Sequence, residues 1–547
     1  MVNSLALRPG LARGANAILL SLLLTGAAAV PVFSQTKVSF SVSSEIGAFS
    51  QSVAAAASDD KAIADFYRES GYAPIWTGQG HELRRSALLN ALAGAGAHAL
   101  PVNRYDPAAI IAASRAARTE GDRGRLDVMM TKALLDYAHD VQTGALEPGK
   151  VLGLIKREVP LRDRRANLEA FVAGEPVAFL KSLPPRTQAY AQLMRAKFEL
   201  EQRLNAGGWG EKVAAQSLKP GATGPAVLQL RDRLVAMNYM PRSVTATYDA
   251  AMQKAVQAFQ IDMGLEADGV AGAGTIEQIN IGPQERLEAV VVAMERERWM
   301  NIDRGSRHIW VNLTDFTAKI VDHGRVTFST RSVIGKSTAD QQTPEFSDLM
   351  EYMVINPTWN VPRSITTKEY LPMMKRNANA AGHLKIYDSR GRVVPRSAIN
   401  FAAYTERTFP YSMKQPPSDG NALGLVKFMF PNPYNIYLHD TPSKSLFARE
   451  VRAFSHGCIR LGDPFDFAYA LLAAQTEDPV GLFQKHLKTG QETSVKLEVP
   501  LPVHLVYFTA YPSAKGRIEY RRDVYGRDAT IFRALQEAGV VLGPYQG

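Results

Sequence analysis

The apolar residues of this chain change their spacing once, from a helical period to a strand period, after a charged segment at 286–299. Before that segment, the stretches 83–92 and 126–141 repeat apolar residues every three or four positions, which predicts amphipathic helices. After it, short stretches rich in Val, Ile and aromatic residues alternate with turn residues, which predicts strands. The pattern therefore indicates a multidomain α+β protein whose second half is mostly β.

The predicted strands leave one long gap between two groups. The strands cover 308–313, 318–321, 326–334, 351–356, 426–430 and 435–439. The insertion at 357–418 contains one predicted helix, at 367–375. Long segments between elements usually have a role, so we expect a lid over a substrate, with a mere decoration of the sheet as the alternative.

Length and composition predict several domains. The chain has 547 residues, enough for conventional hydrophobic cores, and its single cysteine excludes an internal disulfide. We expect a signal peptide (1–34), a Ser- and Ala-rich linker (35–58), a helical domain (59–205), a small helical module (217–282), a mostly β domain (305–490) and a C-terminal extension packed on that domain (491–547).

The N-terminal residues predict export. Arg8 and Arg13 precede an apolar run at 17–30, which closes on Pro31 and is followed by small residues up to Ser34. This is the pattern of a cleavable signal peptide; the run is shorter than the ~20 residues of a spanning helix, although an uncleaved anchor is the alternative. Cleavage would lower the net charge from +10 to +8, and the mature chain would then have no membrane span.

Motifs for nucleic acids, metals and nucleotides are missing from the sequence. The positive charge is spread thinly, without the block of Lys and Arg interleaved with aromatics that a nucleic-acid groove requires. No His-Glu-x-x-His, paired Cys-x-x-Cys or Walker-type loop occurs. We therefore expect no cofactor, no metal and no nucleic-acid partner.

The only cysteine, Cys458, follows Ser455, His456 and Gly457, and a second histidine, His439, lies 19 residues before it. A thiol with a pKa of about 8.5 is mostly protonated at neutral pH and needs a nearby base to become a nucleophile. His456 is beside the thiol in sequence, whereas His439 closes a predicted strand and is held more rigidly. We favour His439 as the base.

Two neighbours complete the candidate site. Gly457 allows a tight turn in which the backbone amides of Gly457 and Cys458 point at a developing oxyanion. Arg460 has the planar guanidinium that suits a substrate carboxylate. Cys458 would also lie on a loop that leads into a helix capped by Asp463, whose dipole helps slightly with thiolate charge. Each residue alone has an ordinary structural explanation; their combination favours catalysis.

The small helical module has a characteristic set of glycine, apolar and polar positions, namely Gly221, Gly224, Val227, Leu230, Leu234, Ala255, Val256, Phe259, Gln260, Gly264, Leu265, Asp268, Gly269 and Thr275. With these residues it resembles the peptidoglycan-binding-like three-helix module of cell-wall enzymes. The resemblance implies binding to the cell wall, and a plain helical spacer is the alternative.

The cysteine motif resembles the L,D-transpeptidase (YkuD-type) signature, in which a histidine precedes a Ser-His-Gly-Cys turn by such a gap. Residues typical of its large periplasmic, YcbB-like subgroup are Asn356, Pro357, Trp359, Val361, Pro362, Asn421, Gly424, Lys427, Asp440, Thr441 and Pro442. The helical region before residue 205 resembles the scaffold domain of that subgroup, and the insertion resembles its capping subdomain. Arg460 replaces the asparagine of the short family consensus.

The resemblance implies a mechanism and a location, the periplasm. Cys458 would attack the carbonyl between diaminopimelate and D-alanine of a stem peptide, and His439, oriented by the backbone carbonyl of Asp440, would transfer the proton. A second stem peptide would resolve the acyl-enzyme into a 3→3 cross-link. Water or a lipoprotein lysine is the alternative acceptor, and carbapenems would acylate the same thiol. A catalytically idle wall-binding scaffold is the non-enzymatic alternative.

Four further residues are expected to contact the substrate. Ser455, His456 and Arg460 would bind the substrate. Tyr437 lies two positions before His439 on the same predicted strand, so both side chains would face the same side of the sheet. Tyr437 could equally be a core residue.

Overall fold

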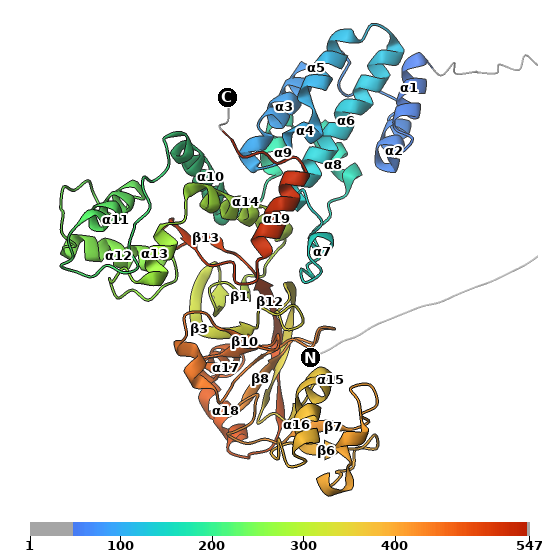
Figure 1. The fold of residues 1–547 in the computed structure, drawn as a ribbon. Helices are drawn as coiled ribbons and strands as arrows, with labels where there is room; N and C mark the ends of the chain where they lie inside the picture. The colour runs from blue at the N-terminus through green and yellow to red at the C-terminus, as the bar shows by residue number, and fades with distance from the viewer. Residues whose placement is uncertain (1–46, 544–547) are drawn as a thin grey trace, which may run out of the picture. The chain divides into compact units, whose positions relative to one another are not determined.

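The computed structural model describes residues 47–543, in which helices come first and most strands follow (Figure 1). This order confirms the predicted multidomain α+β class. The predicted signal peptide, 1–34, lies outside the described residues. Within 47–543, no helix combines the length and the apolar character needed to cross a membrane.

The first helical region is built around α6. Its helices are α1 (Ala48–Ala56), α2 (Lys61–Glu69), α3 (Glu82–Ala93), α4 (Val102–Tyr105), α5 (Pro107–Ala116), α6 (Glu120–Thr143), α7 (Pro148–Val151), α8 (Arg164–Ala173), α9 (Pro176–Ser182) and α10 (Gln188–Asn205). On α6, the buried Asp127 accepts hydrogen bonds from the backbone N–H groups of Ile75 and Trp76. Ile75 and Trp76 are themselves buried.

Helix α1 corrects the predicted linker at 35–58. Its Val53 is fully buried in the core of the first region, and the helix packs so closely on α6 that a side chain at Gly124 would collide with the carbonyl of Phe49. The Ser- and Ala-rich composition hid this helix because small residues give a weak periodic signal but allow close helix packing. Residues 35–46 lie outside the described part.

The small module consists of three helices around its own core. They are α11 (Pro225–Ala236), α12 (Ala250–Asp262) and α13 (Ala273–Ile279). Apolar side chains of the three helices meet there, with Val227, Leu230 and Phe259 almost completely buried. Helix α14 (Pro283–Trp299) follows and packs against α10.

A nine-stranded sheet forms the centre of the second half, in the order β10-β3-β11-β9-β8-β4-β12-β1-β2. Its strands are β1 (Arg307–Asn312), β2 (Thr317–Asp322), β3 (Arg325–Gly335), β4 (Phe346–Ile355), β8 (Val426–Met429), β9 (Leu438–His439), β10 (Ala453–Ser455), β11 (Ile459–Leu461) and β12 (Thr493–Val506). Because β3 also pairs with β2, the sheet curves back on itself. Helices α17 (Pro464–Leu472) and α18 (Pro479–Leu487) pack Phe467 and Phe483 into its core.

The insertion after β4 has a sheet and a core of its own. It contains β5 (Trp359–Asn360), α15 (Arg363–Ile365), a π-helical turn (Thr366–Tyr370), α16 (Leu371–Arg376), β6 (Lys385–Tyr387) and β7 (Ser412–Gln415). The three strands pair in the order β5-β7-β6. Leu371, Phe409 and Met413 are buried in its separate core. We call residues 357–418 the cap.

The central sheet continues past the domain end predicted at residue 490. Strand β12 lies between β4 and β1, and Leu501–Leu505 pairs with Phe346–Met350. Residues up to Val506 are therefore part of this sheet rather than an extension. The remaining residues form β13 (Ala510–Pro512), β14 (Ile518–Tyr520) and α19 (Arg527–Glu537), which pack mainly with α10 and α14.

Candidate active site

His439 lies on β9, between β8 and β11, and has a cationic residue beside it on each neighbouring strand. Lys427 is its register partner on β8, and Arg460 is its partner on β11. Residues opposite each other in a sheet point to the same face, so the three side chains form one row. Lys427 was not among the predicted site residues, although it is the polar position between buried Val426 and Phe428 on β8.

The imidazole of His439 is buried and held by backbone. Its Nδ1 lies 2.5 Å from the carbonyl oxygen of Asp440. A carbonyl can only accept a hydrogen bond, so Nδ1 carries the proton of the neutral ring and Nε2 keeps its lone pair. Burial is the largest cause that lowers the pKa of His439, to about 3, and the charges of Arg460 and Lys427 lower it further. Hydrogen bonds to the backbone of Asp440 and Leu423 raise the pKa and offset part of this effect. The ring is therefore neutral at neutral pH.

The carboxylate of Asp440 fixes the backbone that holds His439. It accepts hydrogen bonds from the backbone N–H groups of Leu425 and Thr441, at 2.9 and 2.7 Å, and pairs with Lys444 at 2.7 Å. Gly424 has a φ of +60°, and a side chain there would overlap the carboxyl group. Asp440 therefore has a positioning contact through its side chain in addition to the predicted one through its carbonyl.

The thiol of Cys458 is half-buried immediately before β11. Its Sγ lies 3.5 Å from the carbonyl oxygen of Asn435. Burial raises the pKa of the Cys458 thiol to about 11, against the hydrogen bonds of Tyr437 and the charges of Arg460 and Lys427, which lower it. Strand β11 lies between Cys458 and α17 along the chain, so Cys458 is not on a loop that leads directly into this helix. The Asp463 side chain accepts a hydrogen bond from Thr330 and does not cap the helix.

The turn before the thiol is closed by Ser455. Its Oγ donates to the carbonyl of Cys458 at 2.5 Å and accepts from the N–H of Gly457 at 3.1 Å. The amide of Gly457, predicted to face an oxyanion, is thus already engaged. The N–H of Cys458 has no hydrogen-bond acceptor among residues 47–543. Gly457 has a φ of +113°, which explains the glycine at this position.

Thr343 stabilises this turn through a hydrogen bond to Gly457. Its buried hydroxyl donates to the carbonyl of Gly457 at 2.7 Å and accepts from the N–H of Gly335 at 3.0 Å. Arg527 of α19 donates to the carbonyl of Thr343 at 2.7 Å, and Tyr525 donates to the carbonyl of Gly335 at 2.6 Å. Except for the contact with Gly335, these contacts join segments far apart in sequence, so no local pattern could have revealed Thr343.

The cap reaches the same turn through Glu369. Its carboxylate lies 2.6 Å from Nε2 of His456, so this imidazole is directed toward the cap. Glu369 belongs to the π-helical turn, and the neighbouring Lys368 pairs with Asp340 at 3.7 Å. The two histidines named from the sequence therefore have different surroundings, a backbone carbonyl for His439 and a cap carboxylate for His456.

The remaining predicted residues, Tyr437 and Arg460, both contact the centre of the site. The ring of Tyr437 lies edge-on to His439, with 5.7 Å between ring centroids, and Tyr437 is among the groups that lower the pKa of the Cys458 thiol. Arg460 is partly buried, and its buried Nε has no hydrogen-bond partner in the described part of the chain. A guanidinium in that state can receive a carboxylate.

Comparison with protein families assigns the region that contains this site. Residues 306–482 match the family described as L,D-transpeptidase catalytic domain. This region is therefore similar to L,D-transpeptidase catalytic domains. Residues 61–196 match a family described as scaffold domain, and residues 223–279 match one described as "Putative peptidoglycan binding domain". The region that matches the L,D-transpeptidase family thus follows two further matched regions in the same chain.

Individual proteins resemble parts of the chain. A protein of Haemophilus influenzae named "Putative L,D-transpeptidase" is 33% identical over 244 residues, and the match covers 44% of this chain and 48% of that protein. The chain therefore spans about half the length of this curated relative. The crystal structure of an L,D-transpeptidase from Xylanimonas cellulosilytica is 17% identical to the chain; the match covers 54% of this chain and 100% of that one, with a TM-score of 0.16. The crystal structure of an L,D-transpeptidase from Stackebrandtia nassauensis is 16% identical; the match covers 53% of this chain and 95% of that one, with a TM-score of 0.20.

Proposed function

We propose that this protein is a peptidoglycan L,D-transpeptidase that acts in the periplasm and forms 3→3 cross-links between stem peptides. The L,D-transpeptidase catalytic domain and the match to a peptidoglycan binding domain support this proposal. One observation carries it. The only cysteine of the chain lies beside the strand of a buried, neutral histidine, whose Nδ1 proton is held by a carbonyl and whose Nε2 can accept a proton.

The acylation step would use these two side chains. Sγ of Cys458 attacks the carbonyl carbon between diaminopimelate and D-alanine, and the thiol proton moves to Nε2 of His439. The carbon–nitrogen bond to D-alanine then breaks, and His439 returns the proton to the departing amine. The product is a thioester on Cys458 and free D-alanine. The neutral state of His439 favours this role, because an imidazolium could not accept the proton.

The negative charge on the substrate oxygen needs a donor. We assign the N–H of Cys458 to this role, because the N–H of Gly457 already donates to Ser455. Arg460 and Lys427 flank the base and lower the pKa of the thiol, so they also favour negative charge at this centre. Arg460 would hold a carboxylate of the donor stem peptide through its guanidinium.

The second step decides the product. The side-chain amine of another diaminopimelate attacks the thioester carbonyl and gives a proton to Nε2 of His439. The new amide bond forms, the carbon–sulfur bond breaks, and His439 returns the proton to the sulfur of Cys458. The cap contact between Glu369 and His456 supports an amine acceptor, since a covered thioester is better protected from water. Hydrolysis would give a carboxypeptidase, and a lipoprotein lysine would give an anchoring enzyme.

The test is incubation of the protein with disaccharide tetrapeptide, followed by mass spectrometry of the products, with Cys458→Ala as the control. We expect a cross-linked dimer and free D-alanine from the parent protein only. Tripeptide without dimer would identify a carboxypeptidase. Absence of both products would contradict enzymatic function and leave the wall-binding scaffold. Carbapenem treatment should add one acyl group to the parent and none to Cys458→Ala.

A further inference from the structure

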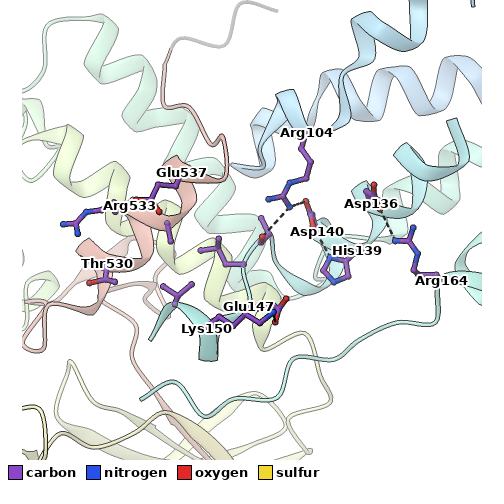
Figure 2. Close-up of a pocket in the computed structure, with 14 residues that line it drawn as sticks. Arg104, Asp136, His139, Asp140, Glu147, Lys150, Arg164, Thr530, Arg533 and Glu537 are labelled. Carbon is purple, nitrogen blue, oxygen red and sulfur yellow. Dashed lines mark hydrogen bonds and ion pairs between the residues drawn. The ribbon is translucent and has the colours of Figure 1, made fainter. Parts of the chain in front are cut away.

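Two large cavities have linings that include none of the active-site residues. The first, of about 810 Å³, lies between α6, α7 and α19 (Figure 2). Its charges are largely compensated within the lining: Arg104 pairs with Asp140 at 2.5 Å and Arg164 with Asp136 at 3.0 Å, the contacts dashed in Figure 2. Lys150 also pairs with Glu147. This cavity therefore offers little uncompensated charge to a ligand.

The second cavity is strongly basic. It has a volume of about 820 Å³ and lies between α10, the α11–α12 side of the module and the turn before β14. Its cationic lining residues are Arg195, Arg203, Arg286, Lys515 and Arg517. Glu199 is the only carboxylate of the lining, and it already pairs with Arg195 at 2.8 Å. We call this space the junction cavity.

Arg286 is the residue in the junction cavity that most requires an anion. Its side chain is 6% exposed, and its guanidinium lies 4.5 Å from the ring centre of Tyr520 and donates to the carbonyl and side chain of Gln278. Within 47–543, no carboxylate lies at ion-pair distance from Arg286. Burial without such a partner lowers the pKa of Arg286 to about 10. A buried cation is costly unless an opposite charge compensates it.

Two other cations of the junction cavity are also without an ion-pair partner. Arg203 is half-buried at the end of α10, and Lys515 is exposed in the turn between β13 and β14. Neither lies within ion-pair distance of a carboxylate in the described part of the chain. With Arg286, they place three uncompensated positive charges on different walls of one cavity.

Aromatic side chains supply apolar surface between these charges. Trp209, Tyr239 and Tyr520 line the cavity, and Arg517 lies 4.2 Å from the ring centre of Tyr239. Aromatic rings offer flat apolar faces on which the carbon faces of sugar rings can pack, while guanidinium and ammonium groups bind carboxylates or phosphates. The combination fits a sugar that carries negative charge better than a neutral sugar or a small inorganic anion.

We propose that the junction cavity binds an anionic saccharide, a sugar chain that carries carboxylate or phosphate groups. The ligand would contact the first helical region, the module and the C-terminal hairpin together, because all three supply lining residues. The site is separate from Cys458 and does not depend on the chemistry proposed there. Its anions would pair with Arg203, Arg286 and Lys515, and its sugar rings would pack on the aromatic wall.

The test is calorimetric titration of the full chain with three probes of similar length. These are a peptide-free muramic-acid glycan, which carries carboxylates, a phosphorylated oligosaccharide, and an uncharged chitooligosaccharide. We expect at least one anionic probe to bind at least tenfold more tightly than the uncharged one. Whichever anionic probe binds more tightly shows whether the ligand carries carboxylate or phosphate groups. Equal binding of the uncharged probe, or no binding of either anionic probe, would overturn the proposal.

A matched pair of double variants tests the location. Arg203→Gln with Lys515→Gln removes two cavity charges, whereas Arg115→Gln with Lys181→Gln removes two exposed charges elsewhere. The cavity variant should weaken binding by about fivefold to tenfold, in line with the loss of two partly exposed ion pairs, and the control by less than about twofold. Equal effects would overturn the assignment. Both variants should keep carbapenem acylation of Cys458, so this result is independent of the transpeptidase proposal.

Discussion

Arg460 and His439 lie directly opposite each other on the neighbouring parallel strands β11 and β9. Burial of the imidazole, together with the charge of Arg460, lowers the pKa of His439 to about 3, while burial raises the pKa of Cys458 to about 11. Between these values the two groups are a neutral imidazole and a protonated thiol. The free enzyme would thus transfer the proton during attack instead of storing a thiolate–imidazolium pair.

The pH dependence of alkylation distinguishes these two states. Cys458 is the only cysteine, so iodoacetamide modification measured by intact-protein mass reports this thiol alone. Because the thiolate is the reactive form and the raised pKa lies far above neutrality, the rate should rise about tenfold per unit between about pH 7 and pH 9. A rate that is already constant at neutral pH would show a stored ion pair and contradict the raised thiol pKa.

Replacement of Arg460 should weaken binding of the donor. In Arg460→Gln the guanidinium that would hold a donor carboxylate is lost, and we expect KM for disaccharide tetrapeptide to rise by about tenfold. Arg460→Lys keeps the charge without the planar fork and should recover only part of this loss. Steady-state kinetics measure both. An unchanged KM in Arg460→Gln would mean that Arg460 does not contact the donor.

Thr343 should position the nucleophile through the carbonyl of Gly457. Thr343→Val keeps the shape but loses two buried hydrogen bonds, which should lower the free energy of unfolding by about 1–3 kcal/mol. The carbapenem acylation rate should fall by about tenfold or more as the turn loses its support.

Thr343→Ser is the matched control, because it retains the hydroxyl and should keep most of the acylation rate. Urea unfolding measures the change in the free energy of unfolding, and the mass increment on Cys458 followed with time measures the acylation rate. An acylation rate in Thr343→Val equal to that of the parent would remove Thr343 from the positioning role, whatever the change in stability.

Glu369 should hold the cap over the thiol. Glu369→Gln removes the charge that faces His456 and should open the cap more often, so iodoacetamide should modify Cys458 several-fold faster. Glu406→Gln, an exposed carboxylate of the same insertion, should leave the rate unchanged. If the two variants behave alike, the Glu369–His456 contact does not control access to the thiol.

Local patterns predicted several elements in both halves of the chain. The helical period located α3 and α6, and the strand period located β1, β2, β3, β4 and β8. The choice of His439 over His456 rested on the strand that carries it, and the structure places His439 on β9 and turns His456 toward Glu369. These features depend on residues close together in sequence.

Features that depend on contacts between residues far apart in sequence were not predicted. Strand β12 enters the sheet between β4 and β1, far from the predicted strands in sequence, so its membership could not be seen from its own pattern. Thr343 forms hydrogen bonds with Gly457 and Arg527, which lie more than 100 residues away in sequence. The engagement of the Gly457 amide by Ser455 depends on the exact turn geometry, which spacing alone does not define.

The central claim, that His439 and not His456 activates Cys458, is tested most directly by single-turnover acylation. Parent, His439→Ala and His456→Ala proteins would be mixed with a carbapenem, and the mass increment on each followed with time. We predict that His439→Ala slows acylation by about 10² to 10⁴, the contribution of a general base, while His456→Ala stays within about threefold of the parent. A near-parental rate for His439→Ala with a large loss for His456→Ala would contradict the account.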